Sequence, residues 1–286
     1  MAESSSQLNV SRPALKVGAL IAAILGLLAC LALAALTGAA GEADGKSNRR
    51  AVLGASKVRV TPNCGTKAGS RSCFVEGKIT GYQSLQRGTT GRNFVVPYRR
   101  GKVVTWSISL SNPTRRDSQS FGPAQQPYFN KLFGSPSRAG ISVLRQTNKK
   151  GNPVFRLIRR SALQTLNPYF GTTVHFALVK PLNVIRGDVV ALTIPTWAPA
   201  FWTPYACAAS RSGDVVNPAR CETASRNNTW RASRQSGRCS IGTDDFDRPN
   251  KALQESRPQQ KLNSRRQYGC YYKAARLLYT ATVVAR

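Results

Sequence analysis

The sequence predicts an all-β fold, a β-sandwich, on three observations. Several stretches alternate apolar and polar residues with a period of two, which is the pattern of a half-buried strand. Turn signals rich in Gly, Pro, Asn and Asp separate these stretches. Only residues 125–133 have a spacing that suits one or two helical turns before Gly134. Many short strands with frequent turns are typical of a sandwich.

Residues 172–202 carry the clearest strand pair. In residues 174–179, Val174, Phe176 and Leu178 are expected to face a core and the alternate residues to face away. Residues 189–194 repeat this alternation, so they also predict a half-buried strand. The sequences Lys-Pro at 180–181 and Arg-Gly-Asp at 186–188 supply turn signals between the two strands.

The other strands are expected on both sides of this pair in the chain. Residues 102–110 alternate most regularly and place Trp106 in the core. Further strands are expected at 74–82, 140–145, 153–160, around Trp230 and at 277–284.

The N-terminal part divides into a polar tail, residues 1–16, and an uncharged apolar run, residues 17–37. At about 1.5 Å per residue the run spans a hydrocarbon layer of about 30 Å, which predicts a single-pass transmembrane signal anchor with a cytoplasmic tail. The alternative is a signal peptide cleaved after residues 38–40, Gly-Ala-Ala, and a secreted protein. Residues 38–56 predict a flexible linker and residues 57–286 an extracytoplasmic domain.

Small residues recur at every fourth position of the apolar run, from Gly18 to Gly38. On a helix they form one stripe, which is a pattern of helix pairing in membranes. Self-association through this helix is therefore a further expectation.

Seven cysteines indicate the compartment. Cys30 lies in the apolar run, and the other six predict three disulfides in an oxidising compartment. Because loop closure costs least between near neighbours, we expect these pairs: Cys64 with Cys73, Cys207 with Cys221, and Cys239 with Cys270. The competing zinc interpretation lacks a C-x-x-C pair, and His175 is the only histidine.

The charge predicts partners. Lys and Arg number 42 against 12 Asp and Glu, a formal net charge of +30. Such a surface attracts polyanions without regard to their sequence, among them acidic wall polymers, membrane surfaces and nucleic acid. The alternative is a basic surface with no dedicated partner.

Two groups of residues are candidate ligand contacts. The first is an aromatic, proline-rich segment after the second central strand: Trp197, Phe201, Trp202 and Tyr205. These rings either form a platform for a sugar or peptide or cap the open end of the sandwich. The second is a basic stripe on the strand at 153–160: Arg156, Arg159 and Arg160.

An acidic cluster, Asp244, Asp245 and Asp247, is the candidate metal site. Three carboxylates on a loop suit calcium, although the EF-hand spacing with its distal Glu is missing. The alternative is that they offset neighbouring arginines, and no other cofactor is predicted.

No catalytic residue is assigned. A nucleophile–histidine site would have to use His175, and no nucleophile elbow or phosphate-binding loop occurs. A carboxylate pair for glycoside hydrolysis would have to come from Glu76, Asp188, Asp214 and Glu222. A non-enzymatic role is therefore favoured.

Four segments carry a resemblance: PYRRGKVVTWSISLSNP, FGSPSRAGISVLR, TVHFALVKPLNVIRGDVVALTIP and TWAPAF. Together they resemble uncharacterised signal-anchored surface proteins of actinobacteria with a jelly-roll-like β-sandwich ectodomain. The likeness covers about residues 95–201. It implies a surface location and a sandwich in which the Arg-Gly-Asp turn brings the chain back across the core, and it transfers no functional residue.

These observations predict a membrane-anchored extracytoplasmic binding or structural module that contacts anionic or carbohydrate polymers of the cell envelope. The alternative is a carbohydrate-active or other secreted hydrolase with an unrecognised site.

Overall fold

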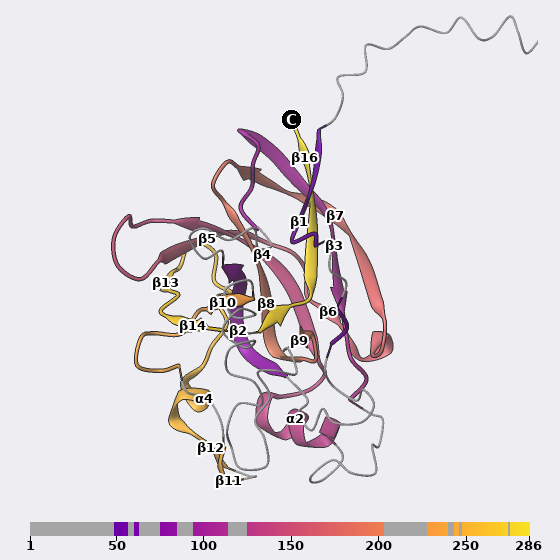
Figure 1. The fold of residues 1–286 in the computed structure, drawn as a ribbon, viewed down its shortest axis with the longest axis vertical. Helices are drawn as coiled ribbons and strands as arrows, with labels where there is room; N and C mark the ends of the chain where they lie inside the picture. The colour runs from indigo at the N-terminus through magenta and orange to yellow at the C-terminus, as the bar shows by residue number, and fades with distance from the viewer. Residues whose placement is uncertain are drawn as a thin grey trace, which may run out of the picture. The chain divides into compact units, whose positions relative to one another are not determined.

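The computed structural model describes residues 49–56, 60–62, 75–84, 94–113, 125–202, 228–239, 243–245, 248–273 and 275–286. Strands dominate these ranges, and every strand pair is antiparallel, which confirms the predicted all-β class (Figure 1). The predicted tail 1–16 and anchor 17–37 lie outside them. Within the described ranges, no helix has the length and apolar character needed to cross a membrane.

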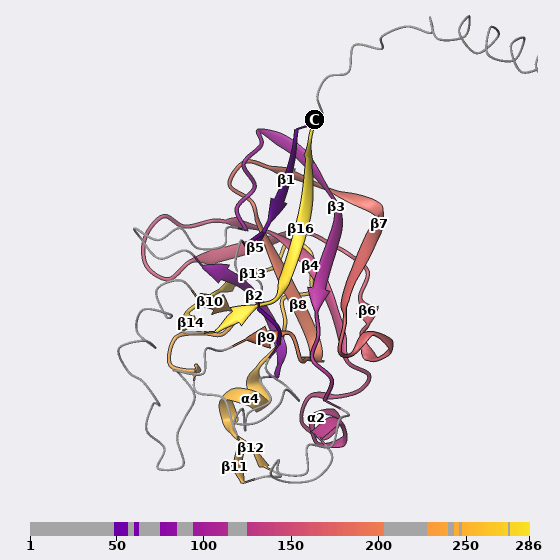
Figure 2. The ribbon, with the colours of Figure 1, turned by 45° about the vertical axis from the view of Figure 1, so that its right-hand side comes forward.

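One sheet has four strands in the order β1-β16-β3-β7. These are β1 (Arg50–Leu53), β16 (Tyr279–Ala285), β3 (Arg100–Ser109) and β7 (Thr173–Ile185). Figure 2 shows β1, β16, β3 and β7 side by side.

The second sheet is larger and follows the order β13-β5-β4-β8-β2-β10-β14, with β6 beside β4. Its strands are β2 (Glu76–Ser84), β4 (Arg138–Gln146), β5 (Val154–Arg160), β6 (Gln164–Thr165), β8 (Val189–Ala198), β10 (Thr229–Ala232), β13 (Arg265–Gln267) and β14 (Cys270–Tyr272). Two short pairs add β9 (Phe201–Trp202) with β15 (Arg276–Leu277) and β11 (Thr243–Asp245) with β12 (Arg248–Pro249). The helices are α2 (Gln125–Phe133), the 3-10 turn η1 (Asn167–Tyr169) and α4 (Lys251–Glu255).

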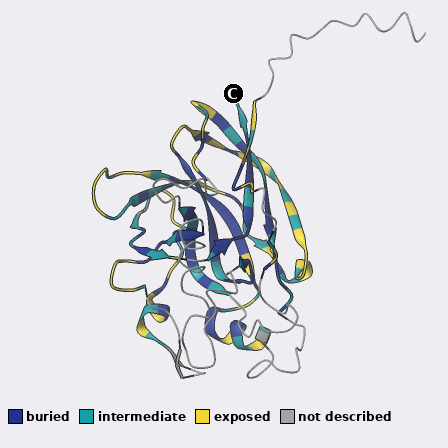
Figure 3. Cartoon of the chain, in the orientation of Figure 1, coloured by how far each residue is buried: buried dark blue, intermediate teal, exposed yellow. Residues whose placement is uncertain are grey.

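The two sheets share one hydrophobic core, which confirms the sandwich-like packing. Trp106 and Ile108 of β3 lie in the same buried cluster as Val190 and Leu192 of β8. The Tyr279 hydroxyl of β16 donates to the Val190 carbonyl oxygen at 2.8 Å, so one hydrogen bond also joins the sheets. In Figure 3 the buried residues follow the strands through the middle of the molecule.

The four-stranded sheet corrects the predicted linker, residues 38–56. Strand β1 lies inside that range and pairs with β16 from Arg50 opposite Val284 to Leu53 opposite Ala281. Leu53 is buried in the core. The sequence Arg-Ala-Val-Leu is too short for its alternation to show without the partner strand, so the fold begins before residue 57.

The two central strands lie in different sheets. The alternation in β7 is confirmed, because Val174, Phe176 and Leu178 are half-buried and the residues between them are exposed. The half-buried prediction for residues 189–194 is wrong, because all of them are buried. Strand β8 is central in its sheet, and both of its faces are covered.

The larger sheet curls, and this curl covers the second face of β8. Strands β13 and β14 are joined by two residues, Tyr268 and Gly269, yet they occupy opposite ends of the strand order. Six strand spacings would separate them by about 29 Å in a flat sheet. Three residue steps reach only about 11 Å, so the sheet must bend back on itself. The buried Tyr268 fills the curl, with its ring centroid 5.1 Å from Phe155 and 5.9 Å from Tyr82.

The Asp188 carboxylate fixes the turn between β7 and β8. Its oxygens accept hydrogen bonds from Arg145 Nε at 2.7 Å, Arg145 Nη2 at 3.0 Å and the Ile185 amide at 3.0 Å. The Asp188 side chain is 1% exposed and that of Arg145 is 35% exposed. Gly187 adopts a positive φ of 87°, a backbone conformation that a residue without a side chain adopts readily. A glycine at this position therefore suits the predicted turn. This turn carries the chain from one sheet to the other.

We expect Asp188→Ala to lower the free energy of unfolding by about 3 kcal/mol, because it leaves the Ile185 amide and the Arg145 fork without their acceptor. Urea unfolding of the two proteins measures the difference. The control is Arg186→Ala on the same turn, whose exposed side chain should contribute less than about 0.5 kcal/mol. Equal effects of the two changes would contradict the role of Asp188.

Candidate functional site

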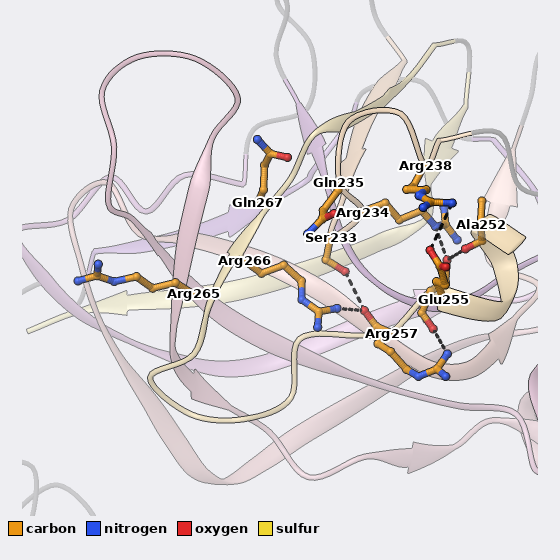
Figure 4. A pocket seen from close by; sticks show the side chains of 11 residues that line it. Ser233, Arg234, Gln235, Arg238, Ala252, Glu255, Arg257, Arg265, Arg266 and Gln267 are labelled. Atoms are coloured by element: carbon orange, nitrogen blue, oxygen red, sulfur yellow. Dashed lines mark hydrogen bonds and ion pairs between the residues drawn. The ribbon is translucent and has the colours of Figure 1, made fainter.

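A cavity of about 450 Å³ lies where the residues after β10, the C-terminal end of α4 and strand β13 meet (Figure 4). Its lining is strongly basic, with one acidic residue, Glu255, against these five arginines: Arg234, Arg238, Arg257, Arg265 and Arg266. The remaining lining residues are small or amide side chains, including Gln235 and Gln267.

Arg234 forms the buried base of the cavity, and its donors are already used. Nε donates to Ser256 Oγ at 2.9 Å, Nη1 to the Tyr272 hydroxyl at 2.8 Å, and Nη2 to Glu76 Oε2 at 3.1 Å. Burial raises the pKa of Glu76, and the positive charge of Arg234 partly offsets that shift. Arg234 is therefore a structural residue that is neutralised inside the protein.

Arg257 and Arg266 have donors to spare. Arg257 uses Nη1 for the carbonyl oxygens of Gln254 and Ser256, and Arg266 uses Nη1 for the carbonyl oxygen of Arg257. Within the described part of the chain, Nε and Nη2 of both residues have no partner. In Figure 4 the Arg266 side chain extends toward Arg257, whereas Arg265 points away from this group.

Arg238 and Glu255 form a loose pair at the exposed side of the cavity. Their closest nitrogen and oxygen atoms are 3.5 Å apart, and the two side chains are 44% and 47% exposed. Glu255 also lies 3.9 Å from Lys251 one helical turn earlier. Exposed pairs of this kind contribute little to stability, so both side chains can turn to a ligand.

The electrostatics of the cavity favour an anion. Lys78 adds a cation near Arg257, and burial followed by the charge of Arg257 lowers the pKa of Lys78. Like charges held close together repel one another, and a bound anion removes that cost. Guanidinium groups present planar forks that match carboxylate and phosphate oxygens. The arrangement can therefore bind an anionic group.

A disulfide holds the cavity in place. Cys239 bonds to Cys270, which confirms one of the three predicted pairs. The Tyr272 hydroxyl donates to the Cys239 carbonyl oxygen at 2.8 Å, so β14 fixes the segment that carries Arg238. The other predicted cysteines lie outside the described residues: Cys64, Cys73, Cys207 and Cys221.

The structure places two of the four predicted aromatic residues in the interior. Trp197 is fully buried, donates from Nε1 to Asn130 Oδ1 at 2.9 Å and packs against Phe129 and Phe170. Phe201 is also buried and contacts Trp230. These two rings are not exposed for stacking, in keeping with the capping interpretation.

The rest of the aromatic segment is less enclosed. Trp202 is half-buried, with the Arg276 guanidinium 5.4 Å from its ring centroid. Tyr205 lies outside the described residues.

The predicted basic stripe is divided between two faces of β5. Neighbouring residues of a strand point to opposite faces, so Arg159 and Arg160 do not lie together. Arg156 lies opposite Arg145 on one side and Arg265 on the other. Its Nε is buried without a partner among the described residues. The arginines that lie side by side are therefore Arg145, Arg156 and Arg265, one on each of three neighbouring strands. The predicted row along β5 is not formed.

The metal and catalytic candidates lie only partly within the described residues. Asp244 and Asp245 lie on β11, Asp247 lies outside the described residues, and no described group of three or more ligand side chains is close enough for a metal. His175 is exposed on β7.

Two of the four carboxylates considered for hydrolysis are described. Glu76 lies opposite Ala198 at one end of β8, and Asp188 precedes the other end. Ten residues of strand put them about 30 Å apart, far beyond the separation of about 5 to 9.5 Å that glycosidases use. Asp214 and Glu222 lie outside the described residues.

The sequence reasoning missed the cavity arginines. Arg238, Arg257 and Arg266 lie in segments without apolar periodicity. The predicted disulfide Cys239–Cys270 is the sequence feature that could have indicated them. It closes a loop that contains Arg257 and Arg266 and begins next to Arg238.

Comparison with known proteins adds no relative: no protein-family model matches the chain, and neither a curated protein nor a solved structure matches it. The chemistry of the cavity is therefore the basis for a function.

We expect Arg234→Met to destabilise the protein by about 3 to 5 kcal/mol at neutral pH, because it leaves the Glu76 carboxylate buried without its cation. The pKa of Glu76, already raised by burial, rises further in this variant. Between the unfolded carboxyl pKa of about 4.3 and the folded value, the native state then binds more protons than the unfolded state. The variant should therefore lose stability as pH rises through that window.

Urea unfolding at about pH 4 and pH 7 measures this dependence, and the deficit should be smaller at the lower pH. The matched control, Arg234→Met with Glu76→Gln, removes the buried charge and should abolish the difference between the two pH values. A deficit in Arg234→Met that does not change with pH would show that Glu76 is not its cause.

Proposed function

We propose that this protein is a membrane-anchored extracytoplasmic module that binds anionic polymers of the cell envelope through the arginine-lined cavity. One observation carries the proposal: three guanidinium groups, of Arg238, Arg257 and Arg266, surround a hollow that contains one carboxylate. The formal net charge of +30 supports it, because long-range attraction brings a polyanion to such a surface.

The location follows from two features. Residues 17–37 are long and apolar enough for an anchor. The Cys239–Cys270 disulfide supports an oxidising compartment for the folded part. Secretion after cleavage near residues 38–40 is the alternative location.

The fold that we propose for the domain is a jelly roll. Its eight main strands in chain order are β1, β2, β3, β4, β5, β7, β8 and β16. The first, eighth, third and sixth form one sheet, and the fifth, fourth, seventh and second lie side by side in the other. This alternation between sheets is that of two Greek keys, as in surface and lectin domains of the same architecture.

Calcium binding by the cluster at 244–247 and pairing of the apolar helix stay predictions. No observation in the described residues favours the hydrolase alternative, since the cavity holds guanidinium and amide groups around a single carboxylate.

We expect the full chain in nonionic detergent to bind a teichoic-acid-like poly(glycerol phosphate), with an affinity that falls steeply as salt rises. Replacing Arg257 and Arg266 by Gln should weaken binding at least about tenfold, because a hydrogen bond to a charged group is worth about 1.5 kcal/mol or more. The slope of log affinity against log salt should also become shallower by roughly 1 to 2. Fluorescence anisotropy of labelled polymer measures both quantities.

The matched control removes two exposed cations of the four-stranded sheet, Arg100→Gln on β3 with Lys180→Gln on β7. It deletes the same charge outside the sheet that carries the cavity and should weaken binding much less. Equal losses in the two double variants would show that charge alone, without the cavity, binds the polymer. Absence of binding at low salt would overturn the proposal.

The location has its own measurement. Fractionation of cells that produce the full chain should leave it in the membrane after a high-salt wash, because an apolar span is not displaced by salt. A protease added outside intact cells should degrade the domain. Release of the protein into the medium would favour the secreted alternative.

A further inference from the structure

We propose that the cavity takes an anionic sugar unit, with its carboxylate or phosphate held by Arg257 and Arg266 and its hydroxyl groups held by Glu255 and the glutamine amides. This inference rests on the proposed function and names the chemical group that the cavity selects from a polymer.

The anion is assigned to Arg257 and Arg266 by their open donors. Each side chain is fixed through Nη1 to backbone carbonyl oxygens of the α4 region. Each keeps Nε and Nη2, which lie on one edge of the guanidinium plane and form the fork that binds two oxygens of one anion. Because the anchor bonds hold both side chains in place, binding an anion costs little side-chain entropy.

Glu255 indicates that the ligand carries hydroxyl groups in addition to its anionic group. A carboxylate among cations weakens the binding of any purely anionic ligand. It is, however, an acceptor, which hydroxyl donors require and guanidinium groups cannot supply. Within the described residues its ion pairs, at 3.5 Å to Arg238 and 3.9 Å to Lys251, are long, so its oxygens can accept further hydrogen bonds.

Two amides extend the set of hydroxyl-binding groups. Gln267 uses Oε1 to accept the Ser236 amide at 3.3 Å and has no further partner in the described chain, so its NH2 group can donate. Gln235 is exposed at the rim, and its side-chain amide makes no hydrogen bond within the described residues. Amides and a carboxylate together both donate and accept, as a polyhydroxylated ligand demands.

The size of the cavity and its lack of rings narrow the ligand further. A volume of about 450 Å³ lies in the range of sites for small organic ligands and exceeds what one phosphate group needs. No aromatic side chain lines the cavity, although single-stranded nucleic acids are bound by stacking their bases on such rings. A sugar acid or a sugar phosphate fits this lining better than a nucleotide does.

Glu255→Gln separates the two kinds of ligand, because it should change their affinities in opposite directions. For an anionic sugar it removes a charged acceptor, and we expect binding of glucuronate and of glucose 6-phosphate to weaken about tenfold. For inorganic phosphate it removes a repelling charge, and we expect binding to strengthen a few-fold. Calorimetric titration of the full chain in nonionic detergent at low salt measures all of these affinities.

A second variant keeps the charge constant. Gln235→Ala should weaken binding of the two anionic sugars and leave inorganic phosphate unchanged. Uncharged glucose, which lacks the anion, should bind far more weakly than either sugar anion to the unaltered protein. Comparison of glucuronate with glucose 6-phosphate then shows whether a carboxylate or a phosphate is the preferred anion.

The inference is overturned if Glu255→Gln strengthens binding of sugar anions and phosphate alike, or if phosphate binds the unaltered protein as tightly as glucose 6-phosphate. In either case, polymer binding that still depends on Arg257 and Arg266 would leave the proposed function intact. If the unaltered protein binds no anion at all, both the further inference and the proposed function are overturned.

Discussion

The cavity depends on a buried arginine whose three nitrogen atoms all donate hydrogen bonds. Arg234 follows β10 and joins three other elements: Glu76 and Gly77 of β2, Tyr272 of β14 and Ser256 at the end of α4. Removing these charges from water is expensive, and the bonds to several partners offset that cost. One side chain thereby attaches the segment that carries the cavity to the edge of the larger sheet.

That segment is an insertion into a simpler sandwich. Between β8 and β16 the chain adds strands at both ends of the larger sheet: β10 beside β2, β14 beside β10, and β13 beside β5. The buried Gln259 binds from inside this segment to the Phe155 and Ser264 carbonyl oxygens, and Tyr268 closes the curl above β8. The central strands thus support the cavity, whose lining comes from β13, the end of α4 and the connection after β10.

Local features were predictable from the sequence, and long-range ones were not. The alternation in β7, helix α2, the Arg-Gly-Asp turn and the Cys239–Cys270 pair each follow from residues that are close in the chain. Strand β1, the double burial of β8 and the cavity depend on partners more than a hundred residues away or on the curl of a sheet. Trp197 was ambiguous for the same reason, because its partner Asn130 lies on a distant helix.

The position of β16 sets the order in which the domain can be completed during synthesis. β16 lies between β1 and β3, and among the described strands β1 has no other neighbour. Strand β1 therefore has no strand to pair with until more than 220 further residues have been synthesised. Contacts of such wide sequence separation form slowly. A chain that stays open until its last strand emerges remains threadable through a narrow pore, which is compatible with the export that we propose.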